Sequence, residues 1–218
     1  LLQSTCTERL TAVRHANGVD VWVLTNDLNS NIFRAWLLTC YGVSSTPVIS
    51  TVGEVMNKSE WMNIGNLKVS SNGKKVCQTF FKDDVVSSQH NFFQLFDFDN
   101  TTGQLSNPQH ISLPNADAVA CEFSPDSKLL YLTDPFRAQM SQVECTLANA
   151  SAIAASSVSI PSTYGYYAIQ LGPDNKIYVN MGTGLLSLIA NPDKKGVDCL
   201  LQEGAIDLGT NARLGLPS

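Results

Sequence analysis

Apolar residues along this chain fall into short runs that are separated by turn-forming residues. The clearest example is Ala118–Thr133, in which the apolar runs Val119–Phe123 and Leu129–Leu132 flank the sequence Ser-Pro-Asp-Ser-Lys. Pro and Asp favour a tight turn, and the flanking runs have the length of β-strands. The pattern therefore predicts two antiparallel strands that are joined by a turn.

The same strand-turn-strand pattern occurs three more times, at Leu10–Thr25, Ile64–Cys77 and Ala168–Asn180. The turns are about 50 residues apart, and a period of this size is typical of repeat architectures. Each repeat continues with two further apolar runs, such as Ile32–Cys40 and Thr46–Val52 in the first repeat. Four short strands joined by turns form one blade of a β-propeller.

The sequence therefore predicts an all-β protein with about four four-stranded propeller blades in one domain. The expected domain covers residues 1–218, with blades at roughly 10–52, 64–113, 118–160 and 168–208. The Ala-rich stretch Leu147–Ser157 has helical propensity. Its place in the repeat favours a turn and a strand there instead.

Composition excludes several classes of partner. The 218 residues are 44% hydrophobic and 15% charged, and the net charge of −5 comes without a basic patch. We therefore expect no nucleic-acid partner. No apolar run approaches the roughly 18 residues that a membrane-spanning helix needs, so we expect no membrane insertion. The chain starts without Met or a signal peptide, and we expect a processed, truncated or partial chain.

The six cysteines lack the spacing of a zinc site, because no Cys-x-x-Cys pair occurs. We expect neither a metal nor a cofactor. Cys77 and Cys121 lie within apolar strand runs and are predicted to be small buried residues. An even number of cysteines would also suit an extracellular protein with disulfides, and the sequence does not give their pairing.

The repeats resemble those of YVTN/WD40-like propellers. More specifically, the chain is similar to the propeller domain of large Bacteroidetes surface proteins with PKD or gliding-motility-type C-terminal domains. The segments that carry this resemblance are Leu10–Thr39, Ile64–Lys75, Leu95–Asn107, Glu122–Asp134 and Ser187–Cys199.

The resemblance implies a secreted or cell-surface location and export by the type IX route. It also implies a ring of six to eight blades, of which this chain contains about four. Uncovered blades would expose strand edges, which soluble proteins avoid. We expect the missing blades to come from another chain, an upstream fragment or self-association.

Four polar residues occupy one equivalent position when the innermost strands are aligned with one deletion in the first repeat. In a propeller these strands line the central channel, so the four side chains are expected to form a polar ring there. Such a ring would bind a ligand or an ion, or it would be a structural set of paired charges. The four residues are Arg14, Lys68, Glu122 and Gln170.

The loops that precede the innermost strands are predicted to form a binding face. They contain Trp61, Asp117, Tyr164 and Tyr166. Exposed aromatic rings suit the recognition of a protein or a glycan. In the alternative interpretation, Trp61 and one or two of the tyrosines cap the blade cores.

The sequence contains no catalytic signature. No Gly-x-Ser-x-Gly motif is present, and His15 and His110 have no matching nucleophile. Asp97 and Asp99 would share one face of a strand and suit Ca²⁺, but a capped hairpin turn explains them more simply. The positive charges of Arg14 and Lys68 would disfavour the binding of a divalent cation in the channel.

These observations favour a non-enzymatic extracellular module for adhesion or for protein or glycan recognition. A first alternative is a lactonase- or lyase-like enzyme with a channel metal, which would need several converging carboxylates. A second is a structural spacer or an assembly component. The fold alone does not distinguish these functions.

Overall fold

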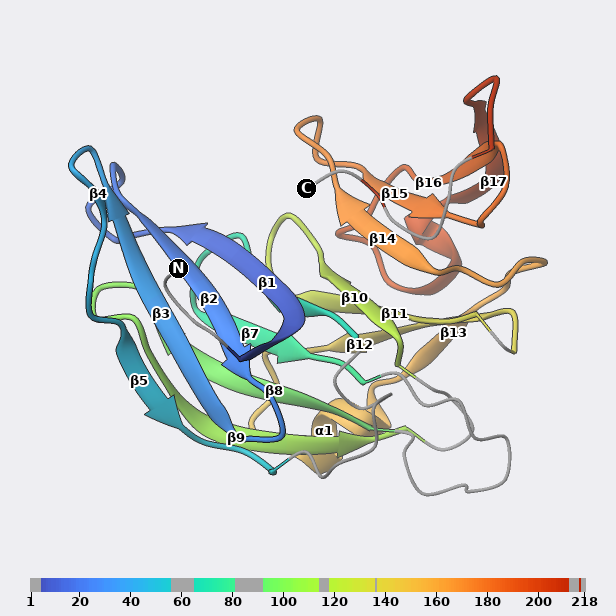
Figure 1. Ribbon diagram of the computed structural model, residues 1–218. Helices are drawn as coiled ribbons and strands as arrows, with labels where there is room; N and C mark the ends of the chain where they lie inside the picture. The colour runs from blue at the N-terminus through green and yellow to red at the C-terminus, as the bar shows by residue number, and fades with distance from the viewer. Residues whose placement is uncertain are drawn as a thin grey trace.

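The computed structural model describes residues 5–55, 65–80, 92–113, 118–135, 137–211 and 216 of the chain. These residues form four antiparallel sheets that follow one another around a common centre (Figure 1). The first sheet contains β1 (Cys6–Arg14), β2 (Val21–Asp27), β3 (Ile32–Thr39), β4 (Gly42–Val43) and β5 (Val48–Thr51). The second contains β6 (Leu67–Val69), β7 (Lys75–Gln78), β8 (Phe92–Asp99) and β9 (Gln104–Ser112).

The other two sheets repeat this order. The third contains β10 (Ala120–Phe123), β11 (Leu129–Asp134), β12 (Gln139–Glu144) and β13 (Val158–Ile160). The fourth contains β14 (Ala168–Leu171), β15 (Ile177–Asn180), β16 (Leu185–Ile189) and β17 (Leu201–Asp207). We call these sheets blades 1 to 4.

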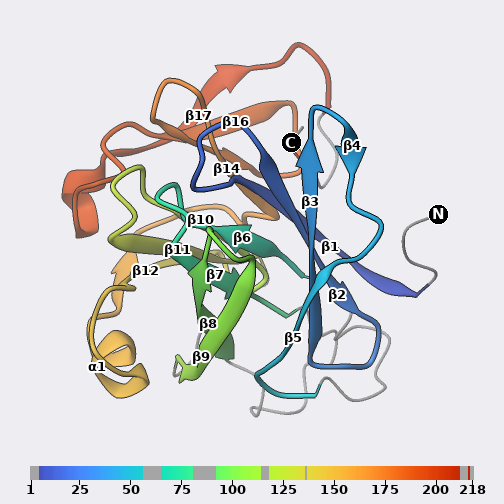
Figure 2. The same ribbon diagram turned by 90° about the vertical axis from the view of Figure 1, so that its left-hand side faces the viewer.

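Blades 2 to 4 are meanders in which consecutive strands pair with one another, and in blade 1 both β4 and β5 pair with β3. The first strands of consecutive blades adjoin, β1 with β6, β6 with β10 and β10 with β14. The two views in Figures 1 and 2 show these strands toward the centre and the last strands toward the periphery. This is a four-blade β-propeller arrangement, and it confirms the predicted fold class.

A serine-anchored turn closes the first hairpin of blades 2 and 3. In blade 2, Ser70 Oγ accepts from the Lys75 amide at 2.9 Å and donates to Asn72 Oδ1 at 2.8 Å. In blade 3, Ser124 Oγ makes the same two contacts, from the Leu129 amide at 3.0 Å and to Asp126 Oδ1 at 2.7 Å. The serine side chain thus satisfies the turn backbone, and the Asn or Asp fixes its shape.

Three clusters of buried apolar side chains hold neighbouring blades together. One lies between blades 1 and 2 and includes Trp22, Leu24, Phe33, Val76 and Phe96. The next lies between blades 2 and 3 and includes Cys77, Phe93, Cys121, Phe123 and Val143. The last lies between blades 3 and 4 and includes Tyr131, Met140, Ile169, Ile177 and Val179. Within the described ranges, no such cluster joins blade 4 to blade 1.

The expectation of turn and strand at Leu147–Ser157 was wrong for its central part, which forms the helix α1 (Ala150–Ala155). Asn149 caps it, because its Oδ1 accepts from the Ala152 amide at 2.9 Å. Ile153 is fully buried in the cluster between blades 2 and 3. Helix propensity, a cap and one buried anchor together outweighed the repeat pattern. In the described part of the chain, no helix is long and apolar enough to cross a membrane.

All six cysteines are free. Cys77, Cys121, Cys145 and Cys199 are fully buried, whereas Cys6 and Cys40 are exposed. The prediction that Cys77 and Cys121 are small buried residues is confirmed. Burial raises the pKa of the Cys77 thiol, so this residue stays a neutral component of the core.

Candidate functional site

Three of the four predicted channel residues meet at the inner strands of blades 2, 3 and 4. Lys68 Nζ on β6 lies 2.9 Å from Glu122 Oε2 on β10 and 2.8 Å from Gln170 Oε1 on β14. Glu122 also accepts hydrogen bonds from the backbone amides of Phe123 and Leu171, both at 3.0 Å. The Glu122 side chain is only 7% exposed and that of Lys68 is 17% exposed. We call Lys68, Glu122 and Gln170 the inner-strand cluster.

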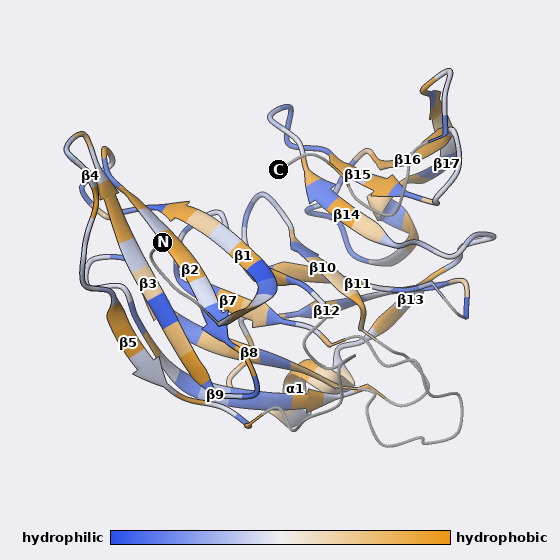
Figure 3. Ribbon diagram, viewed as in Figure 1, coloured by the Kyte–Doolittle hydropathy of each residue, from blue (hydrophilic) through white to orange (hydrophobic). Residues whose placement is uncertain are grey.

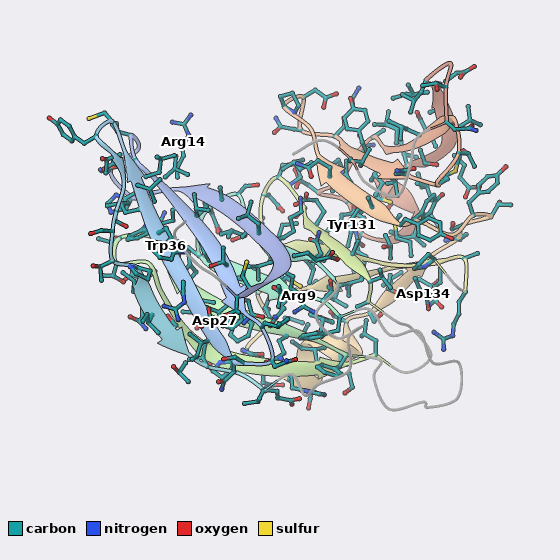
Figure 4. All side chains as sticks on the ribbon, viewed as in Figure 1. Arg9, Arg14, Asp27, Trp36, Tyr131 and Asp134 are labelled. Atoms are coloured by element: carbon teal, nitrogen blue, oxygen red, sulfur yellow. The ribbon has the colours of Figure 1, made fainter. Side chains whose placement is uncertain are left out.

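Arg14 lies outside this cluster. Its Nη1 donates to Gly18 O of its own hairpin turn at 3.1 Å, and Figure 4 shows it at the turn end of β1. Strand register explains the difference. Arg14 and Val21 form the last pair before the turn, as Val69 and Val76 do in blade 2. The position equivalent to Lys68 in blade 1 is therefore Val13, one residue earlier than the sequence alignment placed it.

The geometry of the inner-strand cluster indicates a structural role in linking neighbouring blades. A buried carboxylate is stable only when its charge and lone pairs are satisfied. Glu122 meets this condition through the Lys68 ammonium and two backbone amides, one of which belongs to blade 4. One side chain of blade 3 thus contacts both neighbouring blades.

The two carboxylates that were considered for Ca²⁺ have different partners in the structure. Asp97 is bound by Lys75 Nζ at 2.6 Å and by Asn107 Nδ2 at 2.9 Å. Asp99 instead caps the β8–β9 turn by accepting from the Thr101 amide at 2.9 Å. Among the residues that the structure describes, no three His, Cys, Asp or Glu side chains gather to hold a metal ion.

Two of the four predicted loop-face residues, Trp61 and Asp117, lie outside the described residues. The other two are in the connection between β13 and β14 and differ sharply. Tyr164 is 45% exposed, whereas Tyr166 is fully buried in the cluster between blades 3 and 4. The burial of Tyr166 agrees with the alternative interpretation, in which the ring caps a blade core.

A single carboxylate fastens the connection that carries Tyr164. Glu203 Oε1 on β17 accepts from the Thr163 amide at 2.7 Å and from the Tyr166 hydroxyl at 2.8 Å. Burial raises the pKa of Tyr166 to about 12, so the hydroxyl remains a donor. Burial also acts to raise the pKa of Glu203, but the hydrogen bonds from Thr163 and Tyr166 outweigh it and the pKa lies below its usual value.

Close backbone contact fixes the other side of this connection. A Cβ atom at Gly165 would lie 2.1 Å from the carbonyl oxygen of Pro135, so only glycine fits there. Ser162 Oγ donates to Tyr164 O at 2.7 Å. The segment from Ser162 to Tyr166 is therefore held on both sides of Tyr164.

The low pKa of Glu203 predicts a pH dependence. Its ionised form is favoured in the folded state, so it stabilises the fold above its usual pKa of 4.5, and this contribution is lost as the pH falls through the lower folded pKa. We expect Glu203→Gln to lower the thermal midpoint by about 2 °C at pH 7, since exposed interactions contribute below about 1 kcal/mol. At pH 3 the difference should be smaller. An equal difference at both pH values would show that the ionised carboxylate has no special role.

Sequence reasoning missed two residues that connect blades through polar contacts. Trp22 Nε1 donates to Asn100 O in blade 2 at 2.9 Å, and the Tyr131 hydroxyl donates to Pro192 O in blade 4 at 2.7 Å. Both side chains come from the second strand of their blade and contact the turn between the third and fourth strands of the next blade. A signal was available, because both are large aromatic residues with a polar atom at the same place in the repeat.

No protein-family model and no curated protein matches the sequence. Solved structures do share its fold. The chain is similar, at 14% identity and a TM-score of 0.56, to a structure described as a "putative 6-phosphogluconolactonase" from Bacteroides uniformis ATCC 8492. It is also similar to Kuenenia stuttgartiensis hydrazine synthase, at 13% identity and a TM-score of 0.50.

The alignments cover 95% and 82% of this chain but only 55% and 57% of those chains. The chain therefore spans little more than half the length of the solved structures that it matches. Identities this low support the fold alone. The chain has the architecture of a β-propeller, with four blades in the described residues.

Proposed function

We propose that this chain is a non-enzymatic recognition module that binds a protein or a glycan through the loop face that carries Tyr164. The observation that carries the proposal is that Tyr164 is 45% exposed on a connection held by Glu203 on one side and by the Gly165–Pro135 contact on the other. Aromatic rings contribute much of the binding energy of recognition surfaces.

Rigidity matters because binding costs the conformational entropy of any loop that must become ordered. A connection that is already fixed avoids part of this cost. The position of Tyr164 in the fold also supports the proposal. In an antiparallel meander, the connections between blades leave the strand ends opposite the β3–β4 turn. The exposed ring therefore lies on one end surface of the blades.

The name of one structural neighbour favours a second candidate, a lactonase-like enzyme with a channel metal. Such an enzyme would need free carboxylates in the channel. The one inner-strand carboxylate of the cluster, Glu122, is instead occupied by Lys68 and two amides. Hydrolysis of 6-phosphogluconolactone by the purified chain, with a loss on metal chelation, would establish the enzyme instead.

The resemblance to Bacteroidetes surface propellers supports a secreted or outer-surface location for this module, with export by the type IX route and a role in adhesion. Fractionation of cells that express the native gene would test the location. Recovery of the protein from the cytoplasm alone would contradict it.

The binding proposal is tested with immobilised panels of oligosaccharides and peptides. We expect a selective ligand whose dissociation constant rises about tenfold in Tyr164→Ala, as for the loss of about 1.4 kcal/mol from one aromatic contact. Tyr41→Ala is the matched control, because Tyr41 is 98% exposed in the β3–β4 turn at the opposite end of the strands. Equal binding by wild type and Tyr164→Ala, or no ligand in either panel, would contradict the proposal.

A further inference from the structure

The side of blade 1 that faces away from blade 2 exposes large apolar side chains to solvent, alongside the Arg34–Asp27 ion pair. Side chains alternate along its strands, as the bands of hydropathy in Figure 3 show. One set, which includes Trp22, Leu24 and Phe33, packs on blade 2. The opposite set contains three large apolar side chains that are 64%, 38% and 50% exposed. They are Leu10, Leu38 and Ile49.

Register identifies these three residues as one surface. Leu10 pairs with Thr25, and Thr25 pairs with Arg34, which in turn pairs with Ile49. Leu38 pairs with Val21 at the other end of the same face. Paired residues point to the same side of a sheet. Val21 and Val23 are half-buried on this side, and Trp36, which pairs with Val23, is 5% exposed there. We call this surface the first end face.

Blade 4 has an uncovered side as well, the one that faces away from blade 3. The strand register shows which residues of blade 3 occupy the equivalent positions. Tyr131 pairs with Glu122 in blade 3, and Tyr178 pairs with Gln170 in blade 4. The two tyrosines therefore occupy the same position in successive blades. By the same reasoning, Met140 and Ile160 of blade 3 correspond to two apolar residues of blade 4. These are Leu186 and Ile206.

In blade 3 these positions form an interface. Tyr131, Met140 and Ile160 are at most 2% exposed because blade 4 covers them, and Figure 4 shows Tyr131 between the two sheets. In blade 4, Tyr178 and Ile206 are only half-buried, and the Tyr178 hydroxyl donates to Asp174 of its own turn at 3.0 Å. Leu188, next to Tyr178 in the pairing, is half-buried on the same side. We call this surface the second end face.

We propose that a second copy of this chain covers both end faces, with blade 4 of each copy packed on blade 1 of the other. The resulting ring has eight blades and twofold symmetry. Each chain carries one face that suits a preceding blade and one that suits a following blade, so two copies bury all four faces. The new interface continues the series of three apolar interfaces that already join the blades within one chain.

Closure of the ring by a second copy would also prevent uncontrolled association through the end faces. Two uncovered sheet faces that expose large apolar side chains favour uncontrolled association. A heterologous contact between blade 4 and blade 1 produces a filament unless the rotation closes. Four blades on each side of a twofold axis give a closed arrangement. The alternative occupant is a set of further blades from a longer polypeptide, and the test below separates the two.

The test measures the mass of the purified chain in solution by light scattering at several concentrations. We expect twice the mass of one chain, with dissociation only on dilution. Leu10→Glu on the first end face and Leu188→Glu on the second should each give single chains, because each buries a charge in the contact. Val19→Glu is the matched control, since Val19 is 77% exposed in the β1–β2 turn, away from both faces.

Circular dichroism shows whether each variant keeps its β-structure. A second measurement needs no variant: hydroxyl-radical labelling of Leu10 and Tyr178 in the wild type should be slow at high concentration and fast after dilution. Single chains at every concentration, a polydisperse mass, or a pair that both end-face variants leave intact would overturn the proposal. Single chains with constant labelling would point to further blades of a longer polypeptide. Neither readout depends on a ligand at Tyr164.

Discussion

Glu122→Ala is expected to lower the free energy of unfolding by about 3 kcal/mol, because it removes one partner of a buried ion pair. The substitution leaves the Lys68 ammonium without its carboxylate and takes the acceptor from the Phe123 and Leu171 amides. Urea unfolding of wild type and variant at one protein concentration measures the difference. A fixed concentration matters because association contributes to the apparent stability.

Glu144→Ala provides the matched control. Glu144 in blade 3 also pairs with a lysine of the next blade, Lys195, but both side chains are more than a third exposed. An exposed pair of this kind contributes at most about 1 kcal/mol. Similar losses in the two variants would show that burial of the inner-strand cluster has no energetic consequence.

Tyr131→Ala is expected to cost about 3–5 kcal/mol, as for other buried aromatic side chains. The ring is fully buried between blades 3 and 4, and its hydroxyl donates to Pro192 O. Removal leaves a cavity in the third apolar cluster and an unsatisfied carbonyl. Denaturant unfolding measures the loss.

The same substitution at the equivalent position of blade 4, Tyr178→Ala, is the informative comparison. In a single chain Tyr178 is half-buried, so its removal should cost much less than that of Tyr131. If a second copy covers the second end face, the cost at Tyr178 should approach that at Tyr131 at high protein concentration and decrease on dilution. A Tyr131→Ala variant as stable as wild type would contradict the role of this side chain in joining the blades.

The repeat pattern predicted most of the architecture. Strand-turn-strand units near Asn72, Asp126 and Asp174 form the first hairpins of blades 2, 3 and 4. This success has a local cause. Turn chemistry such as the Ser124–Asp126 contact depends on residues a few positions apart, and alternation along a strand is a property of the strand itself. The repeat pattern failed at α1, where helix propensity, the Asn149 cap and the burial of Ile153 together decided the outcome.

The candidate site was predicted only in part. Alignment of the repeats predicted that Lys68, Glu122 and Gln170 occupy equivalent positions on the innermost strands. In the structure an ion pair and a hydrogen bond connect the three side chains. Arg14 was included because a one-residue change of register cannot be read from a sequence whose turns differ in length. The exposed Tyr164 and the buried Tyr166 are indistinguishable by sequence, since both lie in one connection.

The sequence by itself determined the four-strand repeat, its turns and the apolar side of each strand, because these depend on neighbours along the chain. Tertiary structure alone decided which charges meet, which tyrosine reaches solvent and which blade faces are covered. Glu203 lies 40 residues from Thr163, and Lys68 lies 102 residues from Gln170. Contacts at such separations depend on how the blades pack against one another, which neighbours along the chain do not determine.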